Sequence, residues 1–592
     1  MTSRPLLGLF APAALLVLAG CLNNVPGTDG GPNDTTCIDC NDDAGPTDAG
    51  VDAGFDAGNT EYDAGPIDAG PIDSGAIDAG SIDAGPDDAG VADAGVADAG
   101  EADAGTVDAG PDDAGPVDAG EPDAGSIDAG PFVLAVVDNP NNVLSAVATV
   151  SWASNLGLQT VQLTAVTDGG RNETTPSFNI GDRAGSATLP ILALQPSTHY
   201  DVQATGIDDA GNTYVSPMMP LDTQALPTGM PASNVVTVTD GGTPTPGYTL
   251  VARLATTVAA TDYVTIFDSN GVAAWYWAAP VGIAGDFQKQ PDGTYTIAVT
   301  DTAHTIIGLN SSFGTFTQVD VLGNVIHTWE AESVTGAQPI SVVATDGHEL
   351  RIQPDGSALI LGDTRQTFDL TAYGGKSAAT VVAQVVERIE VDGGVAFAWN
   401  GFDHLSVANV DPVAASVTGN VVDFTHANSI DVMADGNYLV SFRNLSQVIK
   451  IDATTGDILW KLGGADGMFT FVGDSLGGFS CQHAARELPN GDIILFDDGD
   501  GHTPTQSRAV EYALDTTNMT ATLVWSAEDE PPLYSYILGD AQRLDNGNTL
   551  IDYGVPLHVQ EVDPLGNVIW DLFDPTHAYG LYRAFHVDSL YP

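Results

Sequence analysis

The sequence of 592 residues is poor in basic side chains, with 16 Lys and Arg against 79 Asp and Glu and a formal net charge of −63. Nucleic-acid binding through counterion release needs clustered Lys and Arg, so the composition excludes that class of function. Cysteine is also scarce: the four, at positions 21, 37, 40 and 481, are too few for a disulfide-built scaffold. Hydrophobic residues make up 43%, so the chain is not disordered throughout.

The sequence has no long hydrophobic run near its start: the apolar stretch there, Leu6–Leu18, is too short to span a membrane. Following Arg4, it has the layout of a secretory signal peptide, residues 1–20. Small residues precede Cys21, which resembles the bacterial lipobox, in which the cysteine is acylated. An ordinary signal peptide with an incidental cysteine is the alternative. Leu22 stands where an Asp would retain a lipoprotein at the inner membrane. We therefore expect a lipid anchor at the outer membrane or cell surface, facing the periplasm or the exterior.

Residues 21–131 form a low-complexity stalk, in which Asp-Ala-Gly occurs seventeen times and Asp recurs every five residues from Asp63 to Asp128. Small, flexible and mutually repelling residues cannot bury a core, so the stalk is predicted to be a disordered acidic spacer. The five-residue period excludes collagen, and a calcium-binding repeat, the functional alternative, would need strand-forming positions that are missing. Cys37 and Cys40 favour a local disulfide over a metal site, which would require two more ligands nearby.

The composition changes at Pro131, and residues 132–226 read as a small β-sandwich of short strands separated by turn residues. The stretch 194–200 resembles the tyrosine-corner region of fibronectin type III modules, with Trp152 as the core tryptophan of an early strand. The expected strands are Phe132–Val137, Ala146–Trp152, Thr160–Val166, Ser186–Leu192, Tyr200–Ile207 and Thr213–Ser216.

Residues 227–592 contain an uneven repeat: an apolar–acidic pair, a turn, and an alternating strand that ends in Trp. Each unit also has an earlier strand, which follows an Asx-Gly turn in five units and Pro246-Gly247 in the first. Each unit alone would expose both faces of its sheet, so the pattern predicts radial stacking into an all-β, six-bladed β-propeller. Tryptophans are expected to fill the space between the blades. They are Trp275, Trp329, Trp399, Trp460, Trp525 and Trp570.

Alignment of the units on the Asx-Gly turns brings polar residues into register seven positions upstream. Units three and five have His348 and His483 there, and unit four has Asn428, with His426 two residues earlier. If these positions lead into the innermost strands, their side chains converge at one mouth of the central channel. Arg443, on the strand after the unit-four turn, can project the same way. Repetition in register favours a functional cluster over unrelated buried residues.

The chemistry of this cluster favours an oxyanion over a metal ion. Three histidines could bind zinc, but Arg443 and Asn428 are not zinc ligands, and an arginine repels a cation. The guanidinium fork instead bonds two oxygens at once. A neutral histidine can also attack an electrophile and form a covalent intermediate. Cys481, two residues before His483, is expected to be a buried small side chain rather than a nucleophile.

With these residues, the sequence resembles the bacterial arylsulfate sulfotransferase (arylsulfotransferase) family over most of 340–572. Members are secreted six-bladed propellers preceded by a small β-sandwich. They move a sulfuryl group from a phenolic sulfate ester to a phenol through a sulfohistidine, without a nucleotide donor. The segments that carry the resemblance are 426–443, 451–464, 482–499, 507–512 and 539–550.

The resemblance implies a role for each residue of the cluster. His483 would be the nucleophile. Arg443 and Asn428 would hold the sulfuryl oxygens, and His348 and His426 would stabilise the sulfate or carry the phenol proton. No cofactor is implied; the partners are a phenolic sulfate donor and a phenol acceptor, and a homodimer stays open.

A second interpretation starts from the segment 452–460, which also looks like the repeats of quinoprotein-type propellers. The alternative is thus a non-catalytic or quinoprotein-like surface propeller that binds a protein, a glycan, or a quinone cofactor with calcium. Ordinary repeats would not place histidines in register, so the enzyme, an aryl-sulfate sulfotransferase, is favoured.

Overall fold

A computed structural model describes residues 132–239, 242–254, 262–280, 282–300, 314–336, 338–575 and 579–592. The predicted signal peptide, Cys21 and the stalk of residues 21–131 lie outside the described residues. The described chain is all-β, as the sequence predicts, and its helical segments are single turns. These turns are η1 (Ser154–Leu156), η2 (Thr371–Tyr373), α1 (Gly401–His404), η3 (Val407–Asn409) and η4 (Arg443–Leu445).

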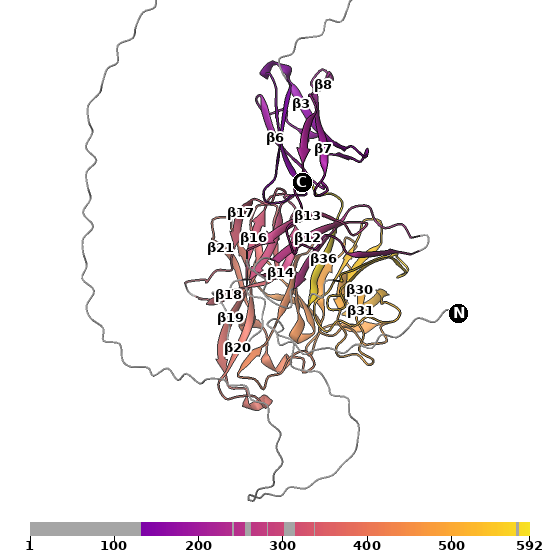
Figure 1. Ribbon diagram of the computed structural model, residues 1–592. Helices are drawn as coiled ribbons and strands as arrows, with labels where there is room; N and C mark the ends of the chain where they lie inside the picture. Colours follow the sequence, from indigo (N-terminus) through magenta and orange to yellow (C-terminus); the bar gives the residue numbers. More distant parts are fainter. Residues whose placement is uncertain are drawn as a thin grey trace, which may run out of the picture. The chain divides into compact units, whose positions relative to one another are not determined.

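The first nine strands form two antiparallel sheets, shown in indigo and purple in Figure 1. One sheet consists of β1 (Val133–Asp138), β2 (Ala146–Ser151) and β6 (Ser186–Ile191). The other consists of β3 (Leu158–Thr167), β4 (Asn172–Thr174), β5 (Phe178–Asn179), β7 (His199–Asp208), β8 (Thr213–Val215) and β9 (Met219–Asp222). Six of these strands lie where the sequence predicts them. The short β4, β5 and β9 were not anticipated, because two to four residues are too few to show a period-two pattern.

The two sheets share one hydrophobic core. Buried and exposed residues alternate along β2, β3 and β7, so one face of each sheet turns inward. Trp152 lies in this core, as the sequence predicts. The hydroxyl of Tyr200 accepts a hydrogen bond from the backbone N–H of Gln195 at 2.8 Å, which is the contact expected of a tyrosine corner.

The remaining strands form six sheets, numbered here from first to sixth in chain order. The first consists of β13 (Ala273–Ala279), β12 (Asp262–Asp268), β11 (Tyr248–Leu254) and β36 (Gly580–Val587). The second consists of β14 (Ile283–Lys289), β15 (Tyr295–Thr300), β16 (Gly314–Val319) and β17 (Val325–Trp329). The third consists of β18 (Val342–Ile352), β19 (Ala358–Phe368), β20 (Ala379–Ile389), β21 (Val395–Asn400) and the parallel β22 (Val421–Asp423).

The last three sheets repeat this plan. The fourth consists of β23 (Ala427–Val432), β24 (Tyr438–Phe442), β25 (Gln447–Ile451) and β26 (Ile458–Gly463). The fifth consists of β28 (His483–Glu487), β29 (Ile493–Asp497), β30 (Arg508–Asp515), β31 (Thr520–Ala527) and the parallel β27 (Thr470–Val472). The sixth consists of β32 (Asp540–Arg543), β33 (Thr549–Asp552), β34 (His558–Val562), β35 (Val568–Phe573) and β10 (Val235–Val238).

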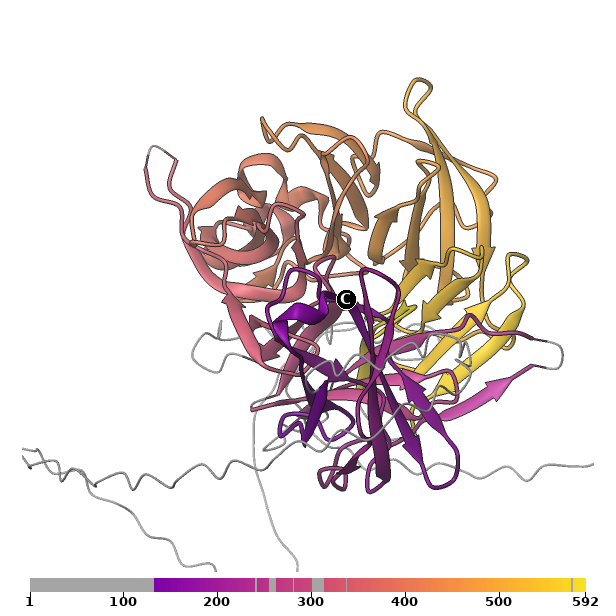
Figure 2. The same ribbon diagram turned by 90° about the horizontal axis from the view of Figure 1, so that it is seen from above.

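One strand of each sheet contacts the corresponding strand of the sheets before and after it, which makes a closed ring of six inner strands. In ring order the inner strands are β36, β14, β18, β23, β28 and β32. Figure 2 shows the sheets following one another from magenta through orange to yellow. The five predicted Asx-Gly turns each join an inner strand to the next strand of its sheet, and their glycines have φ between +83° and +90°.

Strands from both ends of this region close the ring. β36 pairs with β11 on the inner edge of the first sheet, and β10 pairs with β35 on the outer edge of the sixth. The sequence did not predict this arrangement. In the first unit the strand after Pro246-Gly247 is β11, which is second from the centre, and the inner strand comes from 580–587.

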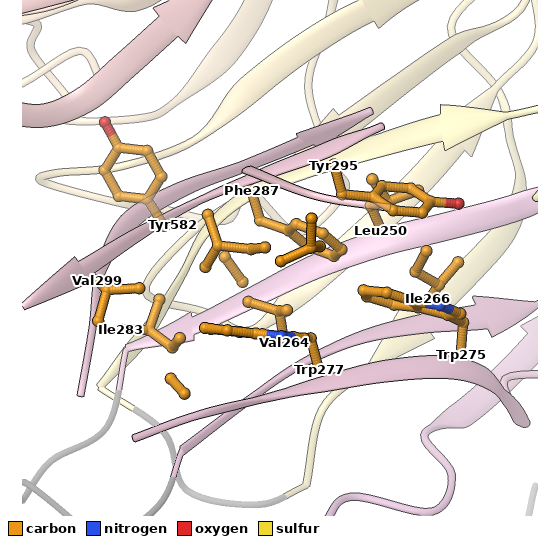
Figure 3. Packing of buried hydrophobic residues seen from close by; sticks show 14 of the residues in the cluster. Leu250, Val264, Ile266, Trp275, Trp277, Ile283, Phe287, Tyr295, Val299 and Tyr582 are labelled. Carbon is orange, nitrogen blue, oxygen red and sulfur yellow. The ribbon is translucent and has the colours of Figure 1, made fainter. Parts of the chain in front are cut away.

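Six hydrophobic clusters lie between consecutive sheets, so the core is distributed around the ring. Figure 3 shows the cluster between the first and second sheets. There Trp275 packs against Tyr295 with ring centroids 4.7 Å apart and stacks on Phe287 at 6.1 Å. Aromatic side chains of this size bury much apolar area per residue, which is what two facing sheets need.

The repeated tryptophans do more than fill space. Four of them donate their indole N–H to a backbone carbonyl in the next sheet around the ring, always in the turn between its last two consecutive strands. The donor–acceptor pairs are Trp275–Val321, Trp399–Gly456, Trp525–Pro564 and Trp570–Ser269. The pair Trp570–Ser269 joins the sixth sheet to the first and so crosses the point of closure.

Replacement of Trp570 by Phe should lower the free energy of unfolding by about 1 kcal/mol more than replacement of Trp460, because a hydrogen bond is lost as well as volume. Trp460 is the matched control, since it has a comparable buried position but no such bond among the described residues. Urea denaturation followed by fluorescence measures both values. Equal losses for Trp570→Phe and Trp460→Phe would show that the indole N–H contributes nothing to closure.

Candidate active site

The structure places the five predicted site residues around the start of the inner strands and buries all of them. His348 and Asn428 lie on β18 and β23, and His483 opens β28. His426 immediately precedes β23, and Arg443 opens the single turn η4 after β24. The ring therefore brings together residues from the third, fourth and fifth sheets, as the register of the repeat predicts.

Irregular backbone marks this end of the strands. The pairing register shifts between Asp346 and Leu350 on β18, between Ala427 and Ser429 on β23, and between His483 and Arg486 on β28. A bulge adds a residue to one strand and redirects the side chains beside it. His426 also has φ of +48°, an uncommon backbone conformation for a residue other than glycine. The local fold thus turns these side chains out of the ordinary alternation of a strand.

Each of the three histidines has its Nδ1 bound by an aspartate. His348 pairs with Asp346, His426 with Asp423 at 2.5 Å, and His483 with Asp498 at 2.7 Å. The rings of His348 and His426 meet edge to face, with centroids 4.8 Å apart. Occupation of every Nδ1 leaves Nε2 as the nitrogen that can meet a ligand.

His483 is held as a neutral imidazole. Burial lowers its pKa well below the ordinary value, and the neighbouring Arg443, His426, His348 and Arg583 add to this effect. The backbone N–H of Leu538 points at Nε2 over 3.4 Å. Nε2 therefore carries the lone pair, the proton lies on Nδ1, and Asp498 accepts it. A neutral imidazole with a lone pair on a defined nitrogen is a competent nucleophile.

Arg443 is buried and firmly held. One terminal nitrogen donates to Asp500 at 3.1 Å and to the carbonyl of Tyr536 at 3.0 Å. The other donates to the amide oxygen of Asn444 at 3.0 Å and to the carbonyl of Ala414 at 3.3 Å. Its charge reaches His483, whose pKa it helps to lower. The structure thus supplies a fixed positive charge whose field reaches the neutral imidazole of His483.

Asn428 anchors the backbone next to His483. Its side-chain N–H donates to the carbonyl of Gln482 at 2.8 Å, one residue before His483. Its buried Oδ1 has no hydrogen-bond partner among the described residues. An amide nitrogen carries two hydrogens, so one remains for a ligand while the other fixes the loop.

Arg583, on β36, is a buried residue of the ring interior that sequence reasoning missed. Its guanidinium donates to the backbone carbonyl of Asn428 and lies 3.4 Å from the carboxylates of Asp286 and Glu349. Burial opposes ionisation of Glu349, yet Arg486 and Arg583 lower its pKa to about 2. Burial raises the pKa of Asp286 to about 7. A charged network thus ties the closing strand to the strand that carries Asn428.

The opposite ends of the inner strands surround two adjoining cavities of about 350 and 450 Å³. Both are lined by Arg351 and Asp431, which lie 3.4 Å apart, and the larger also by Arg486 and Arg543. The ring interior is therefore polar at both ends.

Cys481 behaves as the sequence predicts: its side chain is fully buried. Burial raises the pKa of its thiol well above the ordinary value, so it stays protonated and is no nucleophile. Within the described residues, no three His, Cys, Asp or Glu side chains are grouped so that they could hold a metal ion. In the same part of the chain, no helix is long and apolar enough to cross a membrane.

The aspartates behind the histidines were also missed by the sequence reasoning. Asp346 and Asp423 stand two and three residues before their histidines, a spacing with no signature of its own. Asp498 is 15 residues from His483 and reaches it only because β28 and β29 pair. Its one sequence signal was its place in the segment 482–499, which carries the family resemblance.

A family model described as "Arylsulfotransferase (ASST)" matches residues 233–570, more than half of the chain. No curated protein matches.

A protein of unknown function from Bacteroides caccae is 15% identical, covers 58% of this chain and 100% of its own, and has a TM-score of 0.36. Streptogramin B lyase is 10% identical, with coverages of 72% and 97% and a TM-score of 0.27. NanB sialidase from Streptococcus pneumoniae is 7% identical, with coverages of 77% and 68% and a TM-score of 0.26. Likenesses this distant say nothing about function.

The imidazole of His483 should remain neutral as the pH falls from about 7 to about 5, because a lowered pKa keeps the neutral form dominant below the ordinary value of about 6.5. NMR titration of histidine-labelled protein measures this, with His483→Gln to assign the signal. His199 is an internal control: its hydrogen bond to Asp222 raises its pKa, so it should already carry its proton at the acid end of the titration. Titration of His483 near 6.5 would contradict the burial argument.

Proposed function

The chain belongs to the arylsulfotransferase family, and we propose that it moves a sulfuryl group from a phenolic sulfate ester to a phenol through a sulfohistidine at His483. The observation that carries this proposal is the pairing of His483 Nδ1 with Asp498 in a buried, positively charged environment. The pairing leaves the neutral Nε2 of His483 on the far side of the ring from the Asp498 carboxylate. The positive charges nearby attract an anionic ester.

In the first half-reaction, the lone pair of His483 Nε2 attacks sulfur. The bond from sulfur to the aryl oxygen breaks, and its electron pair leaves with the aryloxide. Phenols have a pKa of about 10, so an aryloxide leaves far more readily than an alkoxide. Loose group transfer of this kind chiefly needs positioning and charge stabilisation, by analogy with phosphoryl transfer. The second N–H of Asn428 is suited to a sulfuryl oxygen, and Arg443, whose terminal N–H groups are bound to protein acceptors, contributes its charge.

In the second half-reaction, the oxygen of an acceptor phenol attacks sulfur, and the bond to Nε2 breaks. The acceptor loses one proton, and the departing aryloxide of the first half-reaction gains one. His348 and His426 each have Nδ1 on a carboxylate, and one of them would enter the first step with a proton on Nε2, give it to the departing aryloxide, and take the acceptor's proton in the second step. The overall reaction therefore needs no external acid or base.

The ring of six sheets supports a six-bladed β-propeller for residues 227–592, and the Tyr200–Gln195 bond supports a fibronectin III-like sandwich for residues 132–226. The sequence before them supports a lipoprotein signal, acylation of Cys21, and a disordered stalk that spaces the catalytic region from an outer membrane.

Purified protein mixed with 4-nitrophenyl sulfate and phenol should release 4-nitrophenolate and form phenyl sulfate. His483→Gln should lower the rate by at least about 10³-fold, because removal of a nucleophile eliminates the covalent route. Mass spectrometry after rapid quenching should find a sulfuryl adduct on His483. His558→Gln is the matched control, since His558 also pairs with an aspartate but lies on β34, outside the site.

Persistence of transfer in His483→Gln would reject this mechanism. Absence of transfer in the native protein, together with calcium- or quinone-dependent absorbance, would favour the quinoprotein-like alternative.

Cys21→Ser should move the protein from the membrane fraction to the soluble fraction of the cells that produce it, because the acyl chains would have no attachment point. Detergent phase partitioning of the two forms measures this, and mass spectrometry of the N-terminal peptide checks the lipid. Equal membrane association of both forms would favour an ordinary signal peptide.

A further inference from the structure

The four residues that follow Leu495 and Phe496 supply three carboxylates: Asp497 ends β29, and Asp498 and Asp500 lie in the turn that leaves it, Asp498–Asp500. Each carboxylate has different partners. Asp497 accepts from the backbone of Ser480 at 2.9 Å and from Arg508 at 2.9 Å, which fixes the start of the turn. Asp498 binds Nδ1 of the candidate nucleophile. Asp500 binds Arg443.

Glycine is required at the centre of this turn. Gly499 has φ of +74°, and a Cβ there would lie 1.9 Å from the carbonyl oxygen of Gln506. The backbone N–H of Gly499 donates to the carbonyl of Ser480, which fastens the turn to the chain just before the nucleophile. Asp498 and Asp500 are therefore presented from one rigid piece of backbone, two residues apart.

The partners of the two aspartates are the two groups that matter most to the proposed chemistry. Asp498 is fully buried, and its backbone carbonyl accepts from Ser507, so its side chain has little freedom to leave His483. Asp500 also accepts from the hydroxyl of Tyr534 at 2.9 Å, which holds it against Arg443. His348 and His426 are supported differently, each by an aspartate two or three residues earlier in its own segment.

We propose that the turn Asp498–Asp500 is a positioning element for sulfuryl transfer, in which Asp498 fixes the tautomer and rotation of His483 and Asp500 fixes the guanidinium of Arg443. This inference rests on the proposed function. Neither aspartate touches the substrate; one acts through the nucleophile and the other through the charge that receives the sulfuryl oxygens.

The attack of His483 on sulfur, which Asp498 supports, requires no loss of a proton from the imidazole. As Nε2 forms its bond to sulfur, the imidazole ring becomes positive, the aryl–oxygen bond breaks, and its electron pair departs with the aryloxide. The proton stays on Nδ1, where its hydrogen bond to the carboxylate strengthens. An asparagine at position 498 can donate to Nδ1 instead, which would place the proton on Nε2 and remove the lone pair that attacks.

The test compares Asp498→Asn, Asp500→Asn and the matched control Asp571→Asn in the full chain. Asp571 is the carboxylate partner of His558, outside the site. With 4-nitrophenyl sulfate as donor, the burst of 4-nitrophenolate measures adduct formation. Asp498→Asn should slow it by about 10²- to 10⁴-fold with little change in KM, by analogy with loss of the aspartate from a catalytic triad. Asp500→Asn should chiefly raise the KM for the donor, by about 10-fold. Asp571→Asn should leave both unchanged.

The pH profile separates positioning from mere structural support. Burial, followed by the charge of Asp500, raises the pKa of Asp498. The native rate of adduct formation should therefore fall as the pH drops through that raised pKa and the carboxylate is lost. Asp498→Asn has no carboxylate at this position, so its residual rate should lack this acid limb. A native rate and pH profile in a folded Asp498→Asn protein would overturn the proposal while leaving sulfuryl transfer intact.

Nitrogen chemical shifts of His483 give a readout that does not depend on activity. The native protein should show the proton on Nδ1, and Asp498→Asn should shift the tautomer toward Nε2–H. If the native protein transfers no sulfuryl group but shows this tautomer change, the proposed function fails and the orienting contact stands. An unchanged tautomer in Asp498→Asn would refute the orienting role of Asp498. Circular dichroism of each variant confirms that the fold is retained.

Discussion

The backbone hydrogen bonds between β36 and β11 are the constraint on which the rest of the site depends. They hold Tyr582 and Arg583 inside the ring, where Tyr582 donates to the carbonyl of His348 and Arg583 to that of Asn428. Without this pairing the first sheet would lack its inner strand, and two site residues would lose their backbone partners. The precise placement of polar groups in the interior is thus a consequence of closing a circle of sheets.

Burial of charge inside that circle is made tolerable by pairing. Each buried arginine of the interior meets carboxylates, and each site histidine meets one aspartate, so few charges are left without a partner. The same environment separates the roles of similar residues. His483 is surrounded by positive charge and stays neutral, whereas the carboxylate of Glu349 is surrounded by arginines and stays ionised.

Most of the correct predictions from the sequence came from its periodic features. Alternating strands, Asx-Gly turns and one tryptophan per unit are local features, and they predicted the strands, the turns and the convergence of His348, Asn428 and His483. The sequence did not reveal Arg583, because its strand joins the first sheet from the far end of the chain and, unlike the other inner strands, precedes no Asx-Gly turn. The role of Asp498 was not predicted, because its contact with His483 joins two paired strands and a single sequence does not show which strands pair. The short strands β4, β5 and β9 were too brief to show a pattern.

The seam between β36 and β11 also bears on how the molecule is made. Contacts between segments more than three hundred residues apart give a chain a high loop-closure cost and slow folding. During synthesis β11 emerges early and must wait, with its inner edge unpaired, until β36 follows it. Because Arg583 arrives on that last strand, the interior can acquire its complete set of charges only in the finished chain. Assembly of the candidate site therefore depends on β36, the last strand to be synthesised.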